Sequence, residues 1–335
     1  MVYYFIDEFC IEFNLYEMNN KKVLVTGGSG FVGIHTVLQL LEQGYSVNTT
    51  LRSMSKKDSI IRALKEGGIT DFSRLSFYEA ELTSDEGWGE AVKDCDYVLH
   101  VASPFPAKDP KDENELIIPA RDGALRVLNA AKNANVKRVV LTSSFAAVGY
   151  SNNVDGHIFT EEDWTDVNIP LPAYIKSKTF AERAAWDFVE KQGAGLELTV
   201  INPVGIFGPV LGSITSASLD IAIVGILNGT TNQSGNFTMG VVDVRDVADI
   251  HIKAMISPEA AGQRFLANAD GVMSFYDVAE LIKSARGSIS ASIAKMQPTS
   301  DKYYRPMSNQ KARMLLNWQP RSREEAILAS VDSLQ

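Results

Sequence analysis

The sequence predicts an α/β protein built around a doubly wound parallel sheet. Short apolar segments rich in β-branched residues alternate with longer segments whose apolar residues recur at helical spacing, from about residue 22 to 203. Strands that alternate with helices form parallel sheets covered by helices. A glycine-rich turn joins the first strand to the first helix. After residue 203 the segments become shorter, which predicts a small C-terminal α+β lobe over the edge of the sheet.

The first strand, turn and helix form the most informative stretch. Residues 23–25 indicate a buried strand, and residues 34–43 carry an apolar helical stripe that ends before Gly44. N–H groups at a helix N-terminus bind phosphate, and side chains in the turn would hold a pyrophosphate away from them. A plain tight turn is the alternative. The flanking strand and helix favour a Rossmann-type dinucleotide site made of Gly27, Gly30, Phe31, Val32 and Gly33.

The second strand is predicted at 45–51, and the residues that follow its end indicate which cofactor is bound. NAD enzymes usually place an acid there for the ribose 2′-hydroxyl, whereas NADP enzymes place an arginine nearby for the 2′-phosphate. Here Arg52 follows the strand, Lys56 and Lys57 lie beyond it, and the first acid is Asp58. A guanidinium binds phosphate through two hydrogen bonds. We therefore expect NADP(H), with a solvated basic helix start as the alternative.

Further strands and helices continue the sheet. At the end of the fourth strand, the small Ala102 and Ser103 let the backbone approach a cofactor, and Phe105 is a candidate wall of a substrate site. His100 is expected to be a core residue rather than a catalytic one. The strands are predicted at 75–78, 96–101, 138–142 and 198–201, and the helices at 59–66, 85–93, 116–133 and 173–192.

After Pro203 the pattern loosens. Residues 205–212 are rich in glycine and predict an irregular stretch. Short helices are expected at 221–227, 246–255, 274–282, 311–316 and 324–331, and short strands at 241–244 and 264–266. We therefore divide the chain into an N-terminal extension (1–20), a dinucleotide-binding core (21–203) and a mainly substrate-binding lobe (204–335), of which some segments return to the core.

Composition narrows the class of protein. The formal net charge of -9 argues against a general nucleic-acid or membrane-surface binder, although it is compatible with an anionic cofactor. The two cysteines, Cys10 and Cys95, and four scattered histidines indicate neither a disulfide framework nor a metal site, so a cytoplasmic protein without metal is expected. No segment approaches the roughly 20 apolar residues of a membrane span. Residues 1–17 do not resemble a secretory signal; either Met18 is the natural start or they form an accessory segment.

Tyr174 and Lys178 form the second informative stretch. Their spacing of four puts both side chains on one face of the helix predicted at 173–192. Tyrosine has a reference pKa of about 10, and a neighbouring cation favours its phenolate, as acid–base work near neutral pH requires. The motif alone is common by chance. Together with the glycine turn and a strand that ends at Ser143 and Ser144, it predicts a catalytic group.

These features resemble the extended members of the short-chain dehydrogenase/reductase superfamily, whose Thr-Gly-x-x-Gly-x-x-Gly fingerprint matches residues 26–33. Further motifs are similar to those of the dihydroflavonol-4-reductase-like branch, which includes plant flavonol and cinnamoyl-CoA reductases and microbial aldehyde and ketone reductases. The resemblance runs from about residue 21 to 334. The matching motifs lie at 100–104, 141–144, 177–182, 202–209 and 243–247.

The resemblance implies roles for individual residues. Tyr174 gives its proton to the carbonyl oxygen as hydride arrives from the nicotinamide, and Lys178 lowers the pKa of Tyr174 and holds the nicotinamide ribose. Ser144 hydrogen-bonds the substrate oxygen, with Ser143 as the weaker alternative. Lys57 joins Arg52 at the 2′-phosphate. The other residues implied at the cofactor are Glu81, Leu82, Val101, Ala102, Ser103, Pro203, Val204, Gly205, Ile206 and Ser218.

Two departures from the family patterns bear on the substrate. Plant flavonol reductases commonly have Asn or Asp five residues after the catalytic serine, where this chain has Gly149, which argues against a flavonol. The residues around Tyr174 differ from those of cinnamoyl-CoA reductases, which argues against a CoA ester. Aromatic residues suggest an apolar pocket, although each is also explained as core. The candidate substrate residues are Phe105, Phe145, Gly149 and Tyr150.

We therefore expect an NADPH-dependent reductase of a small-molecule aldehyde or ketone. One alternative is an NAD-dependent nucleotide-sugar epimerase or dehydratase, against which Arg52 counts. The other is a non-catalytic NADP-binding sensor, against which the intact Ser144, Tyr174 and Lys178 count. No nucleic-acid or membrane partner is expected. The long helices at 116–133 and 173–192 could pair across a two-fold axis, so a monomer and a homodimer both remain open.

Overall fold

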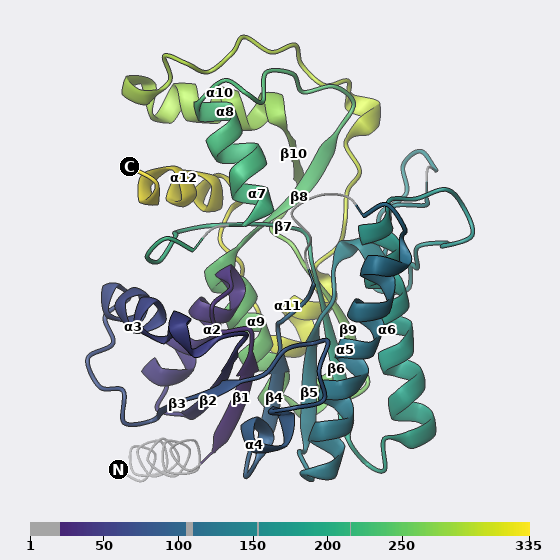
Figure 1. Cartoon of the computed structure of the whole chain (residues 1–335). Helices are drawn as coiled ribbons and strands as arrows, with labels where there is room; N and C mark the ends of the chain where they lie inside the picture. The colour runs from purple at the N-terminus through teal and green to yellow at the C-terminus, as the bar shows by residue number, and fades with distance from the viewer. Residues whose placement is uncertain (1–20, 105–109, 153, 215) are drawn as a thin grey trace, which may run out of the picture.

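A computed structural model describes residues 21–104, 110–152, 154–214 and 216–335, so the predicted N-terminal extension lies outside the described residues. The centre of the fold is a seven-stranded parallel sheet in the order β3-β2-β1-β4-β5-β6-β9 (Figure 1). The chain reaches one edge at β3 and returns to the other side of β1, as the predicted doubly wound sheet requires. The strands are β1 (Lys22–Thr26), β2 (Ser46–Leu51), β3 (Leu75–Glu79), β4 (Tyr97–His100), β5 (Arg138–Thr142), β6 (Glu197–Pro203) and β9 (Arg264–Ala267).

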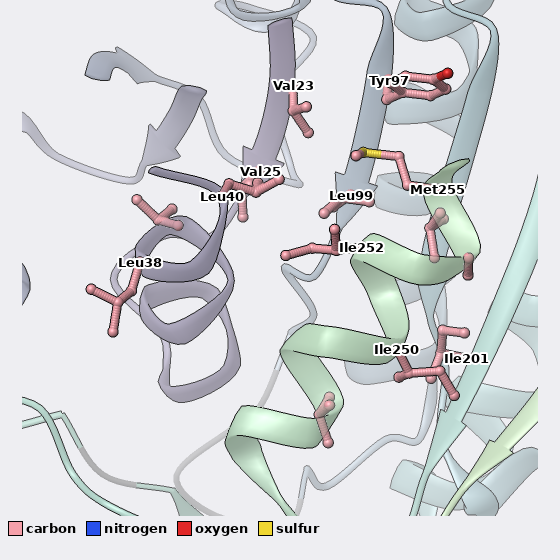
Figure 2. Close-up of a cluster of buried hydrophobic side chains, with 14 of the residues drawn as sticks. Val23, Val25, Leu38, Leu40, Tyr97, Leu99, Ile201, Ile250, Ile252 and Met255 are labelled. Carbon is pink, nitrogen blue, oxygen red and sulfur yellow. The ribbon is translucent and has the colours of Figure 1, made fainter. Parts of the chain in front are cut away.

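One face of the sheet is covered by helices from both halves of the chain. Their apolar stripes bury a large cluster against β1, β2, β4 and β6. Figure 2 shows part of this cluster, in which Ile252 of the late helix α9 points toward Leu99 of β4. The helices of this face are α2 (Phe31–Glu42), α3 (Lys57–Glu66), α9 (Val244–Ile256) and α11 (Gln310–Leu316).

The other face is covered by α4 (Trp88–Val92), α5 (Asn114–Asn133) and α6 (Ala173–Gln192), which bury a second apolar cluster. Of the described helices, α5 and α6 are the longest, and they lie side by side (Figure 1). Because both faces are covered, the central strands are almost continuously apolar. Among the described residues, no helix is long and apolar enough to cross a membrane.

A second, smaller sheet lies beyond the carboxyl ends of the central strands, in the order β10-β8-β7 (Figure 1). A third apolar cluster fills the space between this sheet and its helices. Ser274 caps the helix α10 in a reciprocal capping box with Asp277. The elements of this lobe are β7 (Gly205–Phe207), β8 (Thr238–Asp243), β10 (Val272–Ser274), α7 (Ala217–Leu219), α8 (Gly225–Leu227), α10 (Phe275–Ala285) and α12 (Arg323–Ser333).

The prediction of an irregular stretch at 205–212 is wrong for its first residues. Gly205 to Phe207 form β7, which pairs in parallel with β8. The strand β10 was not predicted either. Each strand has only 3 residues, too few to display an alternating pattern, and each is stabilised by pairing with the distant β8.

Candidate active site

The turn between β1 and α2 adopts a conformation that depends on its glycines. Gly27 has a φ of +71°, and a Cβ there would lie 3.1 Å from Cα of Ala102 at the end of β4. A Cβ on Gly33 would press on the Gly27 carbonyl group, 2.9 Å from its carbon. The N–H of Gly30 donates to the Gly27 carbonyl at 2.9 Å. The turn is therefore packed tightly against the first turn of α2, whose N–H groups have the arrangement that suits an anion.

Phe31 and Val32 open α2 directly after this turn. The Phe31 side chain is buried in the apolar cluster of the lobe, edge-on to the ring of His35 at 5.7 Å between centroids. Val32 is partly buried and packs against the same cluster. Because both side chains pack into this cluster, the predicted contact of Phe31 and Val32 with the cofactor falls to their backbone N–H groups.

Thr26, the last residue of β1, fixes the end of β4. Its hydroxyl lies 2.8 Å from Nδ1 of His100 and accepts a hydrogen bond from the N–H of Ala102 at 3.0 Å. Burial, and secondarily the charge of Lys178, lowers the pKa of His100 to about 3, so its ring is neutral at neutral pH. Val101 and Ala102 are partly buried and Ser103 is exposed, whereas the predicted Phe105 lies outside the described residues.

The end of β2 carries two cations. Arg52 follows the strand and is exposed, and Lys57 begins α3. The Nζ atom of Lys57 lies 5.5 Å from the centroid of the Phe77 ring. Within the described part of the chain, no carboxylate forms an ion pair with either cation. Both charges are therefore available to a phosphate group at this strand end.

Tyr174, Lys178 and Ser144 come together from two elements. Tyr174 and Lys178 lie one turn apart in α6, and Ser144 follows β5 as the N-cap of the short 3-10 turn η2 (Phe145–Ala147). The side chains of Tyr174 and Ser144 are hydrogen-bonded to each other. The Ser144 oxygen also accepts from the N–H of Ala146 at 3.1 Å, which fixes the orientation of the hydroxyl group.

The electrostatics of these groups suit proton transfer. Burial raises the pKa of Tyr174, and its hydrogen bond with Ser144 opposes part of that change. Burial lowers the pKa of Lys178 to about 8, and the charge of Glu182 opposes that shift. A protonated phenol therefore lies beside a lysine whose charge is sensitive to pH just above neutrality.

Glu182 lies one further turn along α6 and is wholly buried. Its carboxylate accepts hydrogen bonds from the Ser143 hydroxyl at 2.6 Å and from Nδ2 of Asn202 at 2.7 Å. Its other oxygen pairs with Nε of Arg264 at 2.5 Å. The carboxylate thus connects α6 to the ends of β5, β6 and β9.

This network also holds the backbone that presents Ser144. Nδ2 of Asn202 donates a second hydrogen bond, of 3.2 Å, to the Ser144 carbonyl. The hydroxyl of Ser143 is buried and committed to Glu182, whereas the hydroxyl of Ser144 meets Tyr174. Of the two serines that the sequence left open, the geometry favours Ser144 as the substrate-facing one.

The remaining residues predicted at the cofactor lie at or beyond the ends of β3 and β6, or in the lobe. Pro203 ends β6, Val204 follows it, and Gly205 and Ile206 belong to β7. Ser218 is partly buried in α7. Beyond β3, Glu81 is exposed and Leu82 packs against α5, where a Cβ added to Gly123 would lie 2.8 Å from the Leu82 Cβ.

Three of the predicted substrate residues, Phe145, Gly149 and Tyr150, line a cavity of about 330 Å³, and the first of them follows Ser144 directly in the chain. A Cβ on Gly149 would lie 2.9 Å from Cε1 of Phe145 and 2.8 Å from Cε1 of Phe159. The two rings fill the space that an Asn or Asp side chain would need. A side chain larger than glycine therefore does not fit at residue 149 in this packing.

Four residues of the site carried no predicted role: Thr26, Glu182, Asn202 and Arg264. The signal for Glu182 is present in the sequence, because it follows Lys178 at the spacing at which Lys178 follows Tyr174. The partners of Glu182 come from distant strands, and no local pattern reveals such contacts.

Comparison with known proteins supports the resemblance that was inferred from the sequence motifs. The model of the NAD dependent epimerase/dehydratase family matches residues 23–267. A Candida albicans protein with the provisional name NADPH-dependent methylglyoxal reductase GRP2 is 35% identical over 322 residues, covering 90% of this chain and 94% of that protein. The cinnamoyl-CoA reductase CAD2 of Medicago truncatula is 34% identical over 325 residues, covering 93% of this chain and 95% of that protein.

Among solved structures, the yeast methylglyoxal/isovaleraldehyde reductase Gre2 complexed with NADPH matches with a TM-score of 0.80 at 29% identity. The match covers 93% of this chain and 98% of that one. Family model, full-length relatives and fold therefore agree with the motifs from which the resemblance was inferred. The chain belongs to the NAD dependent epimerase/dehydratase family of extended short-chain dehydrogenase/reductases, in its dihydroflavonol-4-reductase-like branch.

Proposed function

We propose that this protein is an NADPH-dependent reductase that converts an aldehyde or ketone to the corresponding alcohol. The observation that carries the proposal is the hydrogen bond between Tyr174 and Ser144, with Lys178 one helical turn away, at the sheet edge where the glycine turn lies. The relative from Candida albicans is named as NADPH-dependent, and yeast Gre2 binds NADPH in its structure, which supports the same cofactor here.

The residues of the proposed site account for each step of the reduction. NADPH, when bound, supplies hydride to the carbonyl carbon. Tyr174, kept protonated by burial, donates its phenolic proton to the carbonyl oxygen. Ser144 donates a hydrogen bond to the same oxygen as negative charge develops there. Lys178, as the ammonium ion, stabilises the phenolate that remains, and Glu182 favours that charged form of the lysine.

The residues that we assign to the cofactor fit NADP(H). Without side chains at Gly27 and Gly33 the turn packs closely against Ala102 and against its own backbone, a conformation that presents N–H groups to a pyrophosphate. Arg52 and Lys57 supply the positive charge that a 2′-phosphate requires. The assignment further includes Gly30, Phe31, Val32, Glu81, Leu82, Val101, Ala102, Ser103, Pro203, Val204, Gly205, Ile206 and Ser218, together with Tyr174 and Lys178.

Two other functions are less favoured. A nucleotide-sugar epimerase or dehydratase that retains NAD would need an acid at the end of β2, where Arg52 stands. A dinucleotide sensor without catalysis would not need the contact between Tyr174 and Ser144 or the buried carboxylate that supports it.

The proposal is tested by oxidation of NADPH and NADH with a panel of aldehydes, ketones and 2-oxoaldehydes. Tyr174→Phe is expected to lower kcat by about 100-fold or more, because it removes the proton donor. Tyr276→Phe, in α10 of the lobe, is the matched control and should leave kcat unchanged. NADPH binding without turnover of any substrate would favour a sensor, and equal rates for the Tyr174→Phe variant would refute the assignment of the acid.

We further propose a cytoplasmic location and either a monomer or a homodimer. The chain has 2 cysteines, and burial raises the pKa of the Cys95 thiol to about 12, which fits a reducing compartment in which thiols stay unpaired. Ile118 on α5 is 44% exposed, and pairing of α5 and α6 across a two-fold axis would cover it. Sedimentation distinguishes a species of 36.7 kDa from one twice as heavy.

A further inference from the structure

We infer that the cavity beside the catalytic residues selects carbonyl compounds with an apolar body and a carboxylate group, and that Arg305 binds this carboxylate. The inference rests on the proposed function and names its substrate class. It is argued from the lining of the cavity, from the contacts of Arg305 and from the way in which the backbone around Arg305 is held.

The cavity has the lining of a site for an apolar, flat molecule. Aromatic rings and thioethers of Phe145, Tyr150, Phe159, Phe237, Met239 and Met307 face it. The Phe145 ring lies edge-on to Tyr150, at 5.5 Å between centroids, and to Phe159, at 5.2 Å. These edge-to-face contacts make one wall rigid and leave ring faces for a ligand. A volume of about 330 Å³ accommodates a substituted benzene ring.

Arg305 is the one charged side chain among the described residues that line this cavity. It is partly buried, and its Nη1 group donates to the carbonyl of Asn152. In the described ranges, no carboxylate forms an ion pair with it. A guanidinium carries five N–H donors in a planar fork, so a neutral carbonyl satisfies only a small part of its capacity.

The backbone that carries Arg305 is fixed on both sides. The N–H of Phe159 donates to the Pro306 carbonyl at 3.0 Å, and the N–H of Ser308 donates to the Phe159 carbonyl at 2.8 Å. On the other side, the Thr238 hydroxyl donates to the Tyr303 carbonyl at 2.6 Å. The guanidinium is therefore presented by a held segment, which reduces the entropy cost of binding an anion.

An anionic partner stabilises a partly buried cation in the wall of an apolar cavity, because it offsets the hydration that the cation has lost. Because the described protein residues at the cavity supply none, a substrate carboxylate is the partner of matching chemistry, and two parallel N–H···O bonds would orient it. Phe145 follows Ser144 in the chain, and Tyr150 is close enough to Tyr174 for the two hydroxyl groups to interact, so these two lining residues connect the cavity to the proposed place of carbonyl reduction. A substrate that reaches from there to Arg305 carries its carbonyl and its carboxylate on opposite parts of the apolar body.

The test compares three aldehydes of similar shape: 4-carboxybenzaldehyde, its methyl ester and benzaldehyde. The variant Arg305→Met is expected to lower kcat/KM for 4-carboxybenzaldehyde by about ten- to hundredfold, mainly through KM, and to leave the two neutral aldehydes within about twofold. Arg305→Lys keeps the charge without the fork and should give an intermediate loss. Arg286→Met, at the end of α10 and paired with Asp332 at the surface, is the matched control.

A second measurement needs no turnover. Calorimetric titration of 4-methylbenzoate into the wild-type protein should show binding that Arg305→Met weakens by the same factor. Equal losses for all three aldehydes, or unchanged binding of 4-methylbenzoate, would overturn the inference. If the neutral aldehydes are reduced in a Tyr174-dependent way while the anion is not preferred, the proposed function stands and this inference fails. If no aldehyde is reduced, the proposed function fails, and the titration alone decides whether Arg305 forms an anion site.

Discussion

Replacement of Glu182 by glutamine is the most informative perturbation of the buried network. The substitution keeps the shape of the side chain and removes its charge. Arg264, whose side chain is 9% exposed, then loses the partner at 2.5 Å that neutralises it. The amide has one acceptor oxygen in place of two, so either Arg264 or the two donors Ser143 and Asn202 then face an NH₂ group that cannot accept their hydrogen bonds.

The expected cost follows from the burial of this ion pair. Removing one partner of a buried pair costs about 3–5 kcal/mol, because the remaining charge stays unpaired. For 335 residues, the entropy of unfolding is about 0.7 kcal/mol/K, so the melting temperature should fall by about 4–7 °C. Glu190→Gln, at an exposed position of the same helix, is the control and should melt within about 1 °C of the wild type.

The same variant should change the pH profile of the reaction. Reduction needs the Lys178 ammonium ion, so kcat of the wild type should fall as the pH rises through the pKa of Lys178, about 8. The charge of Glu182 raises that pKa, and its removal should therefore move the falling limb to lower pH. A purely structural role for Glu182 would lower stability and leave the limb in place. An unchanged melting temperature together with an unchanged limb would refute the reasoning.

Three further predictions concern packing and pH. Gly33→Ala should weaken NADPH binding by about ten- to hundredfold in a fluorescence titration, because its Cβ meets rigid backbone in the turn; binding within twofold of the wild type would contradict this. Gly149→Ala should cost about 1–3 kcal/mol by thermal unfolding, and the added change Phe145→Leu should recover part of it if the rings cause the clash. Burial lowers the pKa values of three histidines to about 4, 3 and 4, so the unfolded chain binds more protons below pH 6.5 and each histidine should cost about 2 kcal/mol of stability at pH 5. Asp246, whose pKa burial raises to about 6, offsets about 1 kcal/mol of that loss. The three histidines are His35, His100 and His251. Melting curves at pH 7 and pH 5 test the predicted net loss of stability, and equal melting temperatures at the two pH values would contradict it.

The central sheet could be predicted from the sequence because its signals are local. The strand at Val23 to Val25, the glycine turn and the apolar stripe of the following helix each lie within one short window, and physical periodicities of 2 and 3.6 residues identify them. The spacing of Tyr174 and Lys178 is local in the same sense. The predicted catalytic and cofactor roles of these residues stay predictions until turnover and binding are measured.

The parts that were missed depend on contacts between distant segments. The strands β7 and β10 exist because β8 pairs with both, and Glu182 gains its partners from the ends of three strands. Arg305 lies in a segment without regular structure, and its place at the cavity follows from hydrogen bonds to Phe159. No periodicity in one window carries such information, so only the folded chain reveals it.

The path of the chain between its two sheets limits how this scaffold can be modified. After β8 in the lobe, the chain returns to the core as α9 and β9, leaves it for β10 and α10, returns as α11 and leaves again as α12. A truncation after Pro203 would therefore strip the core of Val247, Phe265 and Trp318, all fully buried. The lobe cannot be exchanged between relatives as a single cassette. New specificity has to be grafted loop by loop onto an intact chain, and circular permutants that begin inside the lobe would have to preserve each return to the core.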